Sequence, residues 1–192
     1  MTAALMGQES LAGASAGTSA AGLSSRPGAL VYIANLHSDT VSVVDTGIGR
    51  VVGSVPVGDG PDSVAVSPDG SRVYVTNFVS DTVSVIDART RTVIATVAVG
   101  DEPSTVTVSA DNQNVYVANV GSDNVSMIST RTRAVTDTIA VGDVPLGVAV
   151  TPDGCTLYAT RALTALDRDE QGGRRGGPDL GLAAGQNPIG RG

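Results

Sequence analysis

The sequence is poor in aromatic residues and in side chains that bind metals or act as nucleophiles. Its 192 residues include no Trp, one Phe, one His and one Cys. The single cysteine, Cys155, excludes a disulfide within the chain. The single histidine, His37, excludes a copper or haem site built from several imidazoles of one chain. We therefore expect no metal site and no cofactor.

Lysine is also absent, so the 12 basic residues are all Arg, against 19 acidic residues and a net charge of −7. An acidic chain is poorly suited to nucleic acid, because neutralising phosphates requires a basic surface. No apolar run approaches the roughly 18 residues of a membrane-spanning helix. The N-terminal stretch is rich in Ala, Gly and Ser without a basic start, which is not typical of a signal peptide. We predict neither a nucleic-acid partner nor a membrane span.

What the chain has in abundance is repetition. Its four tyrosines are each 42 residues from the next: Tyr32, Tyr74, Tyr116 and Tyr158. They stand in 31-VYIANLHSDTVSVVD-45, 73-VYVTNFVSDTVSVID-87, 115-VYVANVGSDNVSMIS-129 and the short 157-LYATR-161. A fixed period of this length is typical of a solenoid, a propeller or another repeat array.

One repeat predicts four short strands and no helix. Val, Ile and Thr are concentrated in Ser63–Val66, Arg72–Thr76, Thr82–Ile86 and Thr92–Val99, and turn residues bound each run. Runs of β-branched residues this closely spaced are typical of an antiparallel meander. Their apolar residues alternate or are almost continuous, which fits a sheet covered on both faces. The first strand of each repeat also centres on a small or β-branched residue: Ala65, Thr107 and Ala149.

The turns recur as regularly as the strands. The turn after the first strand carries residues that adopt a positive φ at least cost. These are Gly28, Gly70, Asn112 and Gly154. The connection between repeats carries proline, which stops ladder pairing where the chain crosses to the next unit. These prolines are Pro61, Pro103 and Pro145.

Four-stranded antiparallel units of this length are typical of β-propeller blades. The stretch 74-YVTN-77, with SDTVSVID and VGDxPxxVAVxPDG at fixed spacing, resembles the YVTN-family β-propeller repeat, and the resemblance covers roughly residues 25–160. It implies an all-β fold, seven-bladed in the usual member. It also implies a surface-layer or exported protein. It implies no catalytic residue, because the letters of the motif are structural.

The repeats predict an incomplete propeller of about three blades. We expect a flexible segment over 1–24, propeller repeats over 25–160, and a disordered Gly/Arg-rich tail over 161–192. Residues 61–99 and 103–141 give two complete blades, whereas 31–58 and 145–160 give parts of two more. The strand missing before Val31 would fall at 19–23, where the pattern is weak. Three explanations are open: a ring assembled from several chains, terminal segments that cover the end faces, and a truncated gene product, which we favour.

No constellation of catalytic residues is visible. His37 is interpreted as a solvated loop residue, and Cys155 as a buried or half-buried structural thiol, since no His lies in its repeat. No Ser stands in a nucleophile motif, and no glycine-rich nucleotide motif occurs. The tail contains 172-GGRRGG-177, but the acids around it favour a charge-balanced disordered segment over a nucleic-acid contact.

A meander places alternate connections at opposite ends of its sheet, so the two ends should differ in charge. One end gathers acids without Arg: Asp39, Asp59, Asp62, Asp81, Asp101, Glu102, Asp123 and Asp143. The other gathers Arg72, Arg89, Arg91, Arg131 and Arg133 with a few Asp. The candidate binding residues are Asp39, Asp59, Asp81, Asp101, Asp123 and Asp143, which could bind a cation or a basic protein. The alternative is that these Asp side chains cap turns.

Three functions are consistent with these patterns. The first is a non-catalytic binding or scaffold module, with another copy or another propeller chain as a candidate partner. The second is part of a lactonase- or quinoprotein-like enzyme, against which the scarcity of His and Glu argues. The third is a truncated propeller without function. The resemblance favours export or the cell surface, whereas the N-terminal stretch favours the cytoplasm.

Overall fold

The computed structural model describes residues 3–6 and 28–161, which form fourteen β-strands and no helix. The first sheet contains β1 (Ala3–Met6), β2 (Leu30–Asn35), β3 (Thr40–Asp45) and β4 (Arg50–Pro56). The second contains β5 (Pro61–Val66), β6 (Arg72–Asn77), β7 (Thr82–Asp87) and β8 (Thr92–Ala98). The third contains β9 (Pro103–Val108), β10 (Asn114–Asn119), β11 (Asn124–Ser129) and β12 (Ala134–Ala140). The fourth contains β13 (Pro145–Val150) and β14 (Leu157–Arg161).

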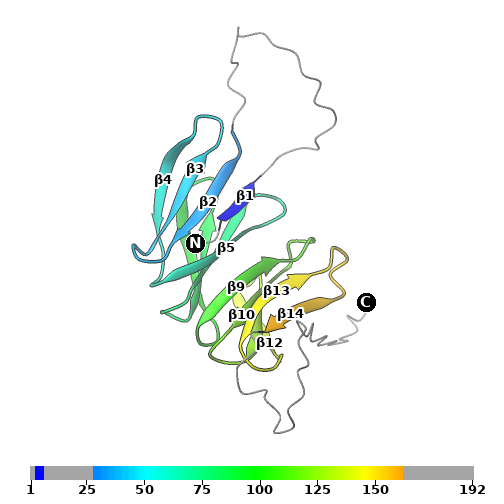
Figure 1. Cartoon of the computed structure of the whole chain (residues 1–192). Helices are drawn as coiled ribbons and strands as arrows, with labels where there is room; N and C mark the ends of the chain where they lie inside the picture. Colours follow the sequence, from blue (N-terminus) through cyan, green and yellow to red (C-terminus); the bar gives the residue numbers. More distant parts are fainter. Residues whose placement is uncertain (1–2, 7–27, 162–192) are drawn as a thin grey trace, which may run out of the picture.

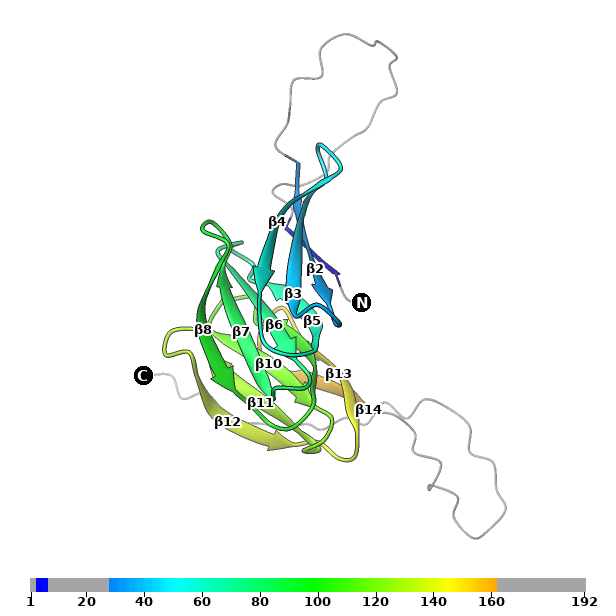
Figure 2. The same ribbon diagram turned by 90° about the vertical axis from the view of Figure 1, so that its left-hand side faces the viewer.

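Each sheet is an antiparallel meander, as the repeat predicts, and the four strands expected between residues 61 and 100 are confirmed within about two residues. The register is the same from sheet to sheet: Asn35 pairs with Thr40, Asn77 with Thr82 and Asn119 with Asn124. Successive sheets follow one another around the molecule as propeller blades do, and within the described residues they do not close into a ring (Figures 1 and 2). The all-β, incomplete-propeller prediction is confirmed.

The predicted turn chemistry is confirmed in three of four copies. Gly70, Asn112 and Gly154 have φ of 69°, 59° and 71° in the turn that follows the first strand of their sheets. The fourth copy, Gly28, is the first residue of its described segment, and a Cβ there would lie 1.9 Å from the backbone nitrogen of Gly47.

The core lies between sheets, and each interface uses the same repeat positions. Tyr32, Val41 and Val43 of the first sheet pack against Val73 and Ile86 of the second. The second and third sheets repeat this contact with the residues one period on: Tyr74, Val83, Val85, Val115 and Ile128. The third and fourth sheets do so again with Tyr116, Val125 and Val148. One 42-residue unit therefore encodes both the sheet and the two faces that it offers its neighbours.

The strand beside β2 is the main departure from the sequence-based expectation. We expected it at 19–23, which lies outside the described residues. The structure instead pairs β1 with β2, so that Ala3 faces Ile33 and Met6 faces Leu30. The segment 1–24, expected to be flexible, thus supplies a strand at residues 3–6, whereas the prediction for 162–192 also falls outside the described part of the chain.

The exposed fraction of its tyrosine shows how completely each sheet is covered by the next. Tyr32 is 0% exposed, Tyr74 3%, Tyr116 8% and Tyr158 44%. Tyr158 lies on β14, whose sheet has two strands in the described residues. The interior of the stack is thus well packed, and the fourth sheet is its most open part. No helix in the described segments is long and apolar enough to cross a membrane.

Candidate functional site

The acidic end of the sheets is formed by two sets of connections. The turns between β2 and β3, β6 and β7, and β10 and β11 lie there, because the register pairs Asn35 with Thr40 and its equivalents. The connections that lead into β5, β9 and β13 lie at the same end, since Pro61 pairs with Asn77 and Pro103 with Asn119. We call this end the acidic rim, and it carries Asp39, Asp59, Asp81, Asp101, Asp123 and Asp143.

Three of the six predicted site residues, Asp39, Asp81 and Asp123, hold successive units together. Each accepts a backbone N–H from the connection that follows its sheet, and we call this contact a clasp. The Oδ1 atom of Asp39 accepts the backbone N–H of Gly60 at 2.9 Å, 21 residues further on. Asp81 and Asp123 accept the equivalent N–H groups of Glu102 and Val144 at 2.9 and 2.8 Å. All six of these clasped residues have positive φ: Asp39, Gly60, Asp81, Glu102, Asp123 and Val144. The turn-capping interpretation therefore accounts for Asp39, Asp81 and Asp123.

The same connections are tied to the following sheet. The carbonyl of Gly60 accepts the N–H of Phe78 at 2.8 Å, and the N–H of Asp59 donates to the Ser80 hydroxyl at 3.1 Å. The next unit repeats both bonds, from Val120 to Glu102 at 3.0 Å and from Asp101 to Ser122 at 2.7 Å. The connections into β5 and β9 are thus each held by one sheet behind and one ahead, which fixes their backbone.

The other three predicted residues keep their carboxylates free. Asp59, Asp101 and Asp143 are exposed, and within the described residues their side-chain oxygens accept no hydrogen bond. They recur once per repeat on the clasped connections. The described part of the chain contains no group of three or more His, Cys, Asp or Glu residues placed to hold a metal ion. The geometry thus presents a row of separate carboxylates.

Two residues at this rim differ from the sequence-based expectation. Arg161 pairs with Pro145 and therefore lies at the end that we expected to contain no Arg. It occupies the repeat position of Asn77 and Asn119, so the fourth copy replaces a neutral amide with a cation. Asp62 lies on the innermost strand of the second sheet, where partial burial raises the pKa of its carboxyl above the usual value.

The opposite end of the sheets carries both signs of charge. Arg72 forms an ion pair with Asp87, with Nη1 and Oδ2 2.9 Å apart. Arg91 donates through Nη1 to the carbonyl of Val52 in the preceding sheet at 2.9 Å. Hydrogen bonds from the Ser67 hydroxyl and the Ser71 N–H hold the pKa of Asp69 below its usual value. The two ends differ in charge as predicted, with the second end mixed and the first acidic.

Polar residues inside the sheets are likewise used for structure. The Nδ2 atom of Asn77 donates to the Thr82 and Ser84 hydroxyls at 2.9 and 3.0 Å, and Asn77 is 0% exposed. The Thr76 hydroxyl accepts the N–H of Ser63 and donates to the carbonyl of Ser104 in the third sheet, both at 2.9 Å. The sequence analysis missed this link between sheets, because Thr76 has Ala at the matching positions of the neighbouring repeats.

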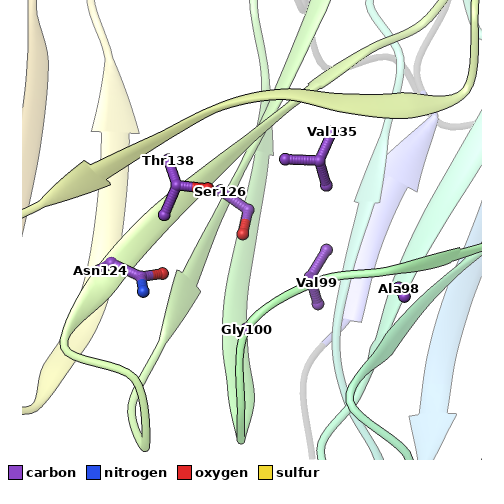
Figure 3. Close-up of a pocket in the computed structure, with 7 residues that line it drawn as sticks. All are labelled: Ala98, Val99, Gly100, Asn124, Ser126, Val135 and Thr138. Carbon is purple, nitrogen blue, oxygen red and sulfur yellow. The ribbon is translucent and has the colours of Figure 1, made fainter.

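A cavity of about 290 Å³ lies between the outer parts of the second and third sheets. Its walls are Ala98, Val99 and Gly100 on one side and Asn124, Ser126, Val135 and Thr138 on the other, as Figure 3 shows. The Asn124 amide is already engaged, because Oδ1 accepts from Asn119 at 2.7 Å and Nδ2 donates to the Ser122 carbonyl at 2.9 Å. The cavity is therefore an open gap between blades whose wall is part polar and part apolar, with no titratable group in it.

The single histidine and the single cysteine of the sequence lie in different turns. His37 is exposed in the turn between β2 and β3, at the acidic rim. Cys155 lies in the turn between β13 and β14 and is exposed, so the expectation of a buried or half-buried thiol is wrong. Its counterparts in the complete sheets, Ser71 and Gln113, are exposed in the same turn, and the N–H of Cys155 donates to Asp153 at 3.0 Å.

The repeat geometry agrees with one family of known proteins. The family model described as YNCE-like beta-propeller matches residues 9–112 and 68–167. The chain belongs to the YNCE-like beta-propeller family. Membership explains the shared register of the sheets and agrees with the resemblance to YVTN-type repeats.

Solved structures similar to this member of the family include two chains of different size. A chain of Kuenenia stuttgartiensis hydrazine synthase is 34% identical, with a TM-score of 0.67, over 69% of this chain and 38% of its own length. A functionally unknown protein from Desulfotomaculum acetoxidans is 17% identical, with a TM-score of 0.59, over 69% of this chain and 45% of its own length. The second likeness shows the fold alone.

Among curated proteins, the PE-PGRS family protein PE_PGRS18 of Mycobacterium tuberculosis is 47% identical over 47 residues. The match covers 24% of this chain and 10% of that protein. This propeller chain therefore spans less than half of each of the three relatives that it resembles.

Proposed function

We propose that this chain is a non-catalytic scaffold that binds a basic polypeptide segment along its acidic rim. The observation that carries the proposal is that the rim carboxylates fall into two sets, one hydrogen-bonded to the backbone and the other exposed. Asp39, Asp81 and Asp123 fix the backbone, and this leaves one exposed carboxylate per repeat on a rigid connection: Asp59, Asp101 and Asp143. Rigid, regularly spaced charges favour an extended partner with complementary charge, and they steer its approach.

The polar residues that recur in the repeat also support a scaffold over an enzyme. The recurrent side chains of Asn35, Asn77 and Asn119 donate hydrogen bonds to the adjacent strand, and those of Asp39, Asp81 and Asp123 hold the turns. A fold does not by itself imply an activity, and function depends on the groups at a site. The alternative, part of a propeller enzyme, is favoured by the likeness to a hydrazine synthase chain, and it would place the reacting groups outside the matched repeats.

Binding of a fluorescent oligo-arginine peptide, measured by anisotropy at several salt concentrations, tests the scaffold proposal. We expect saturable binding that weakens with salt, because exposed charges are screened. The triple variant Asp59→Asn, Asp101→Asn, Asp143→Asn should lose about tenfold or more in affinity. The matched control is Asp69→Asn, Asp111→Asn, Asp153→Asn, which removes the same charge from the opposite end and should retain binding. Equal losses in both variants, or no binding by the parent chain, would refute the proposal.

A further inference from the structure

The two end faces of the stack are the unpaired halves of one repeated interface. At the first sheet, Val31, Ile33 and Val44 point away from the second sheet and are only half-buried. Their counterparts one repeat later are Val73, Val75 and Ile86, all 0% exposed under the Tyr32 face. At the other end, Tyr158 is 44% exposed, whereas its counterparts Tyr32 and Tyr74 are 0% and 3% exposed beneath the next sheet.

These end faces are complementary because the chain already joins the same positions internally. The Tyr face of one sheet receives the Val/Ile face of the next at the first and second internal interfaces. The closest approach between sheets involves the inner strands, where β5 and β6 lie against β9, and β9 and β10 against β13. The fourth sheet possesses these two inner strands in β13 and β14, so it presents the inner part of that surface, with Tyr158, to another sheet. Figure 1 shows the first sheet and the β13–β14 pair at opposite ends of the stack.

We propose that two copies of this chain associate head to tail, with the Val31, Ile33 and Val44 face of each copy packed on the Tyr158 face of the other. Head-to-tail contacts form a ring when the rotation between copies closes. One chain supplies four sheet positions. Two copies supply eight, which lies within the roughly four to eight sheets of closed propellers, whereas three copies would exceed that range. The pair therefore covers both exposed end faces at once.

This association goes beyond the scaffold function and does not depend on it. A monomeric chain that binds oligo-arginine would overturn the association alone. A dimer that fails to bind oligo-arginine would overturn the scaffold function alone. The two proposals also use different surfaces, because the acidic rim lies at the strand ends and the end faces lie on the sheets themselves.

Light scattering coupled to size-exclusion chromatography of the 192-residue chain tests the proposal. We expect a single species of twice the 19.1 kDa of one chain. Tyr158→Asp and Ile33→Asp should each yield monomers, through a loss of about 30-fold or more in dimer affinity. Val79→Asp is the matched control, because Val79 is 66% exposed on a loop of the second sheet and should leave the dimer intact. Tyr158→Asp decides the matter if Ile33→Asp fails to fold, since Tyr158 is already partly solvated.

Mixing the two variants distinguishes this arrangement from one in which identical faces pack together. Tyr158→Asp retains an intact Ile33 face, and Ile33→Asp retains an intact Tyr158 face, so an equimolar mixture should recover dimers through one unaltered interface. A face-to-face dimer that pairs identical surfaces would gain nothing from the mixture. A monomeric parent chain, a species larger than two copies, a dimer that survives both substitutions, or a mixture that stays monomeric would each overturn the proposal.

Discussion

The carboxylate of Asp81 accepts the backbone N–H of Glu102 at 2.9 Å, and both residues have a φ of 53°. A left-handed backbone is costly for residues other than Gly, with Asn and Asp the best tolerated. The hydrogen bond thus holds two unfavourable conformations in place at once, one in the β6–β7 turn and one in the connection to the third sheet. The clasp recurs at Asp39 and Asp123, so it is a general device for passing from one sheet to the next.

Replacement of Asp81 tests the clasp. Asp81→Ala removes the acceptor and puts Ala at a left-handed position, and we expect it to destabilise the chain by about 1–3 kcal/mol. Asp81→Asn keeps an acceptor oxygen and a residue tolerant of positive φ, so it should recover most of that loss. Urea unfolding of the two variants measures the difference. Equal stability of the Ala and Asn variants would show that the hydrogen bond to Glu102 contributes nothing.

Thr76→Val tests the hydroxyl that links the second and third sheets. Valine preserves the shape but leaves the Ser63 N–H and the Ser104 carbonyl without this partner, both of them buried. We expect a loss of about 1–3 kcal/mol in the free energy of unfolding. Thr96→Val makes the same chemical change on an exposed residue of β8 and should alter stability by less than about 0.5 kcal/mol. Similar losses in the two variants would exclude a specific role for the Thr76 hydroxyl.

Gly100→Ala tests the close approach of a connection to the third sheet. An added Cβ would lie 2.8 Å from Nδ2 and 2.9 Å from Cβ of Asn119, whose side chain is buried and cannot withdraw. We expect the overpacking to cost about 1–3 kcal/mol by chemical denaturation. In Gly53→Ala the nearest atom would be Cδ of Arg91 at 3.4 Å, so this control should be neutral or slightly stabilising. A stable Gly100→Ala variant would contradict the packing described here.

Alkaline pH should destabilise the fold through its buried tyrosines. Burial raises the pKa of Tyr32, Tyr74 and Tyr116 above the usual 10.0. Above about pH 10 the unfolded chain therefore loses phenolic protons that the folded chain keeps, and the free energy of unfolding falls as pH rises. Absorbance at the phenolate band should increase for these residues only together with loss of β-sheet circular dichroism. Titration of all four tyrosines before any unfolding would refute this expectation.

Acid should remove a different contribution, from the turn aspartates. Hydrogen bonds from Ser67 and Ser71 lower the pKa of Asp69 below the usual 3.8. The charged carboxylate therefore stabilises the fold above about pH 3.8, and this contribution is lost as pH falls through the lower folded-state value. Asp69→Asn keeps an acceptor but cannot titrate, so its stability deficit relative to the parent chain should shrink below that pH. Urea midpoints of both proteins measured across the acid range provide the test.

Much of the fold could be predicted because the same 42-residue unit recurs along the sequence. The register of Val, Ile and Thr fixed strand limits within about two residues, and Gly70 and Asn112 marked a turn that requires positive φ. The strand Ala3–Met6 could not be predicted, because its sequence shares nothing with the SVAV pattern of β5 and its pairing depends on a free edge of β2. Pairing with a free edge depends on the tertiary arrangement and leaves little trace in local sequence.

The sequence indicated only one partner of each clasp, the Asp that accepts the hydrogen bond. Asp at positions 39, 81 and 123 suggested turn capping, but the left-handed partners are Gly60, Glu102 and Val144, which share no property that predicts positive φ. Gly60 was the one available signal, since Gly is the residue that most readily adopts it. Exposure of Cys155 was also missed, although its counterparts in the same turn, Ser71 and Gln113, are polar and exposed.

The identical use of positions at each interface has a consequence for how such chains can change length. Tyr32 packs on Val73, Val75 and Ile86. Tyr74 packs on the equivalent residues one repeat later, Val115, Val117 and Ile128. If a whole 42-residue unit were removed, Tyr32 of the first sheet would therefore meet residues of the same kind at the same positions. Each clasp would be re-formed as well, since Asp39 could hold the N–H of Glu102 in place of Gly60. Duplication or loss of one repeat in the gene therefore costs this architecture little at the new junction, because each sheet contacts only its neighbours.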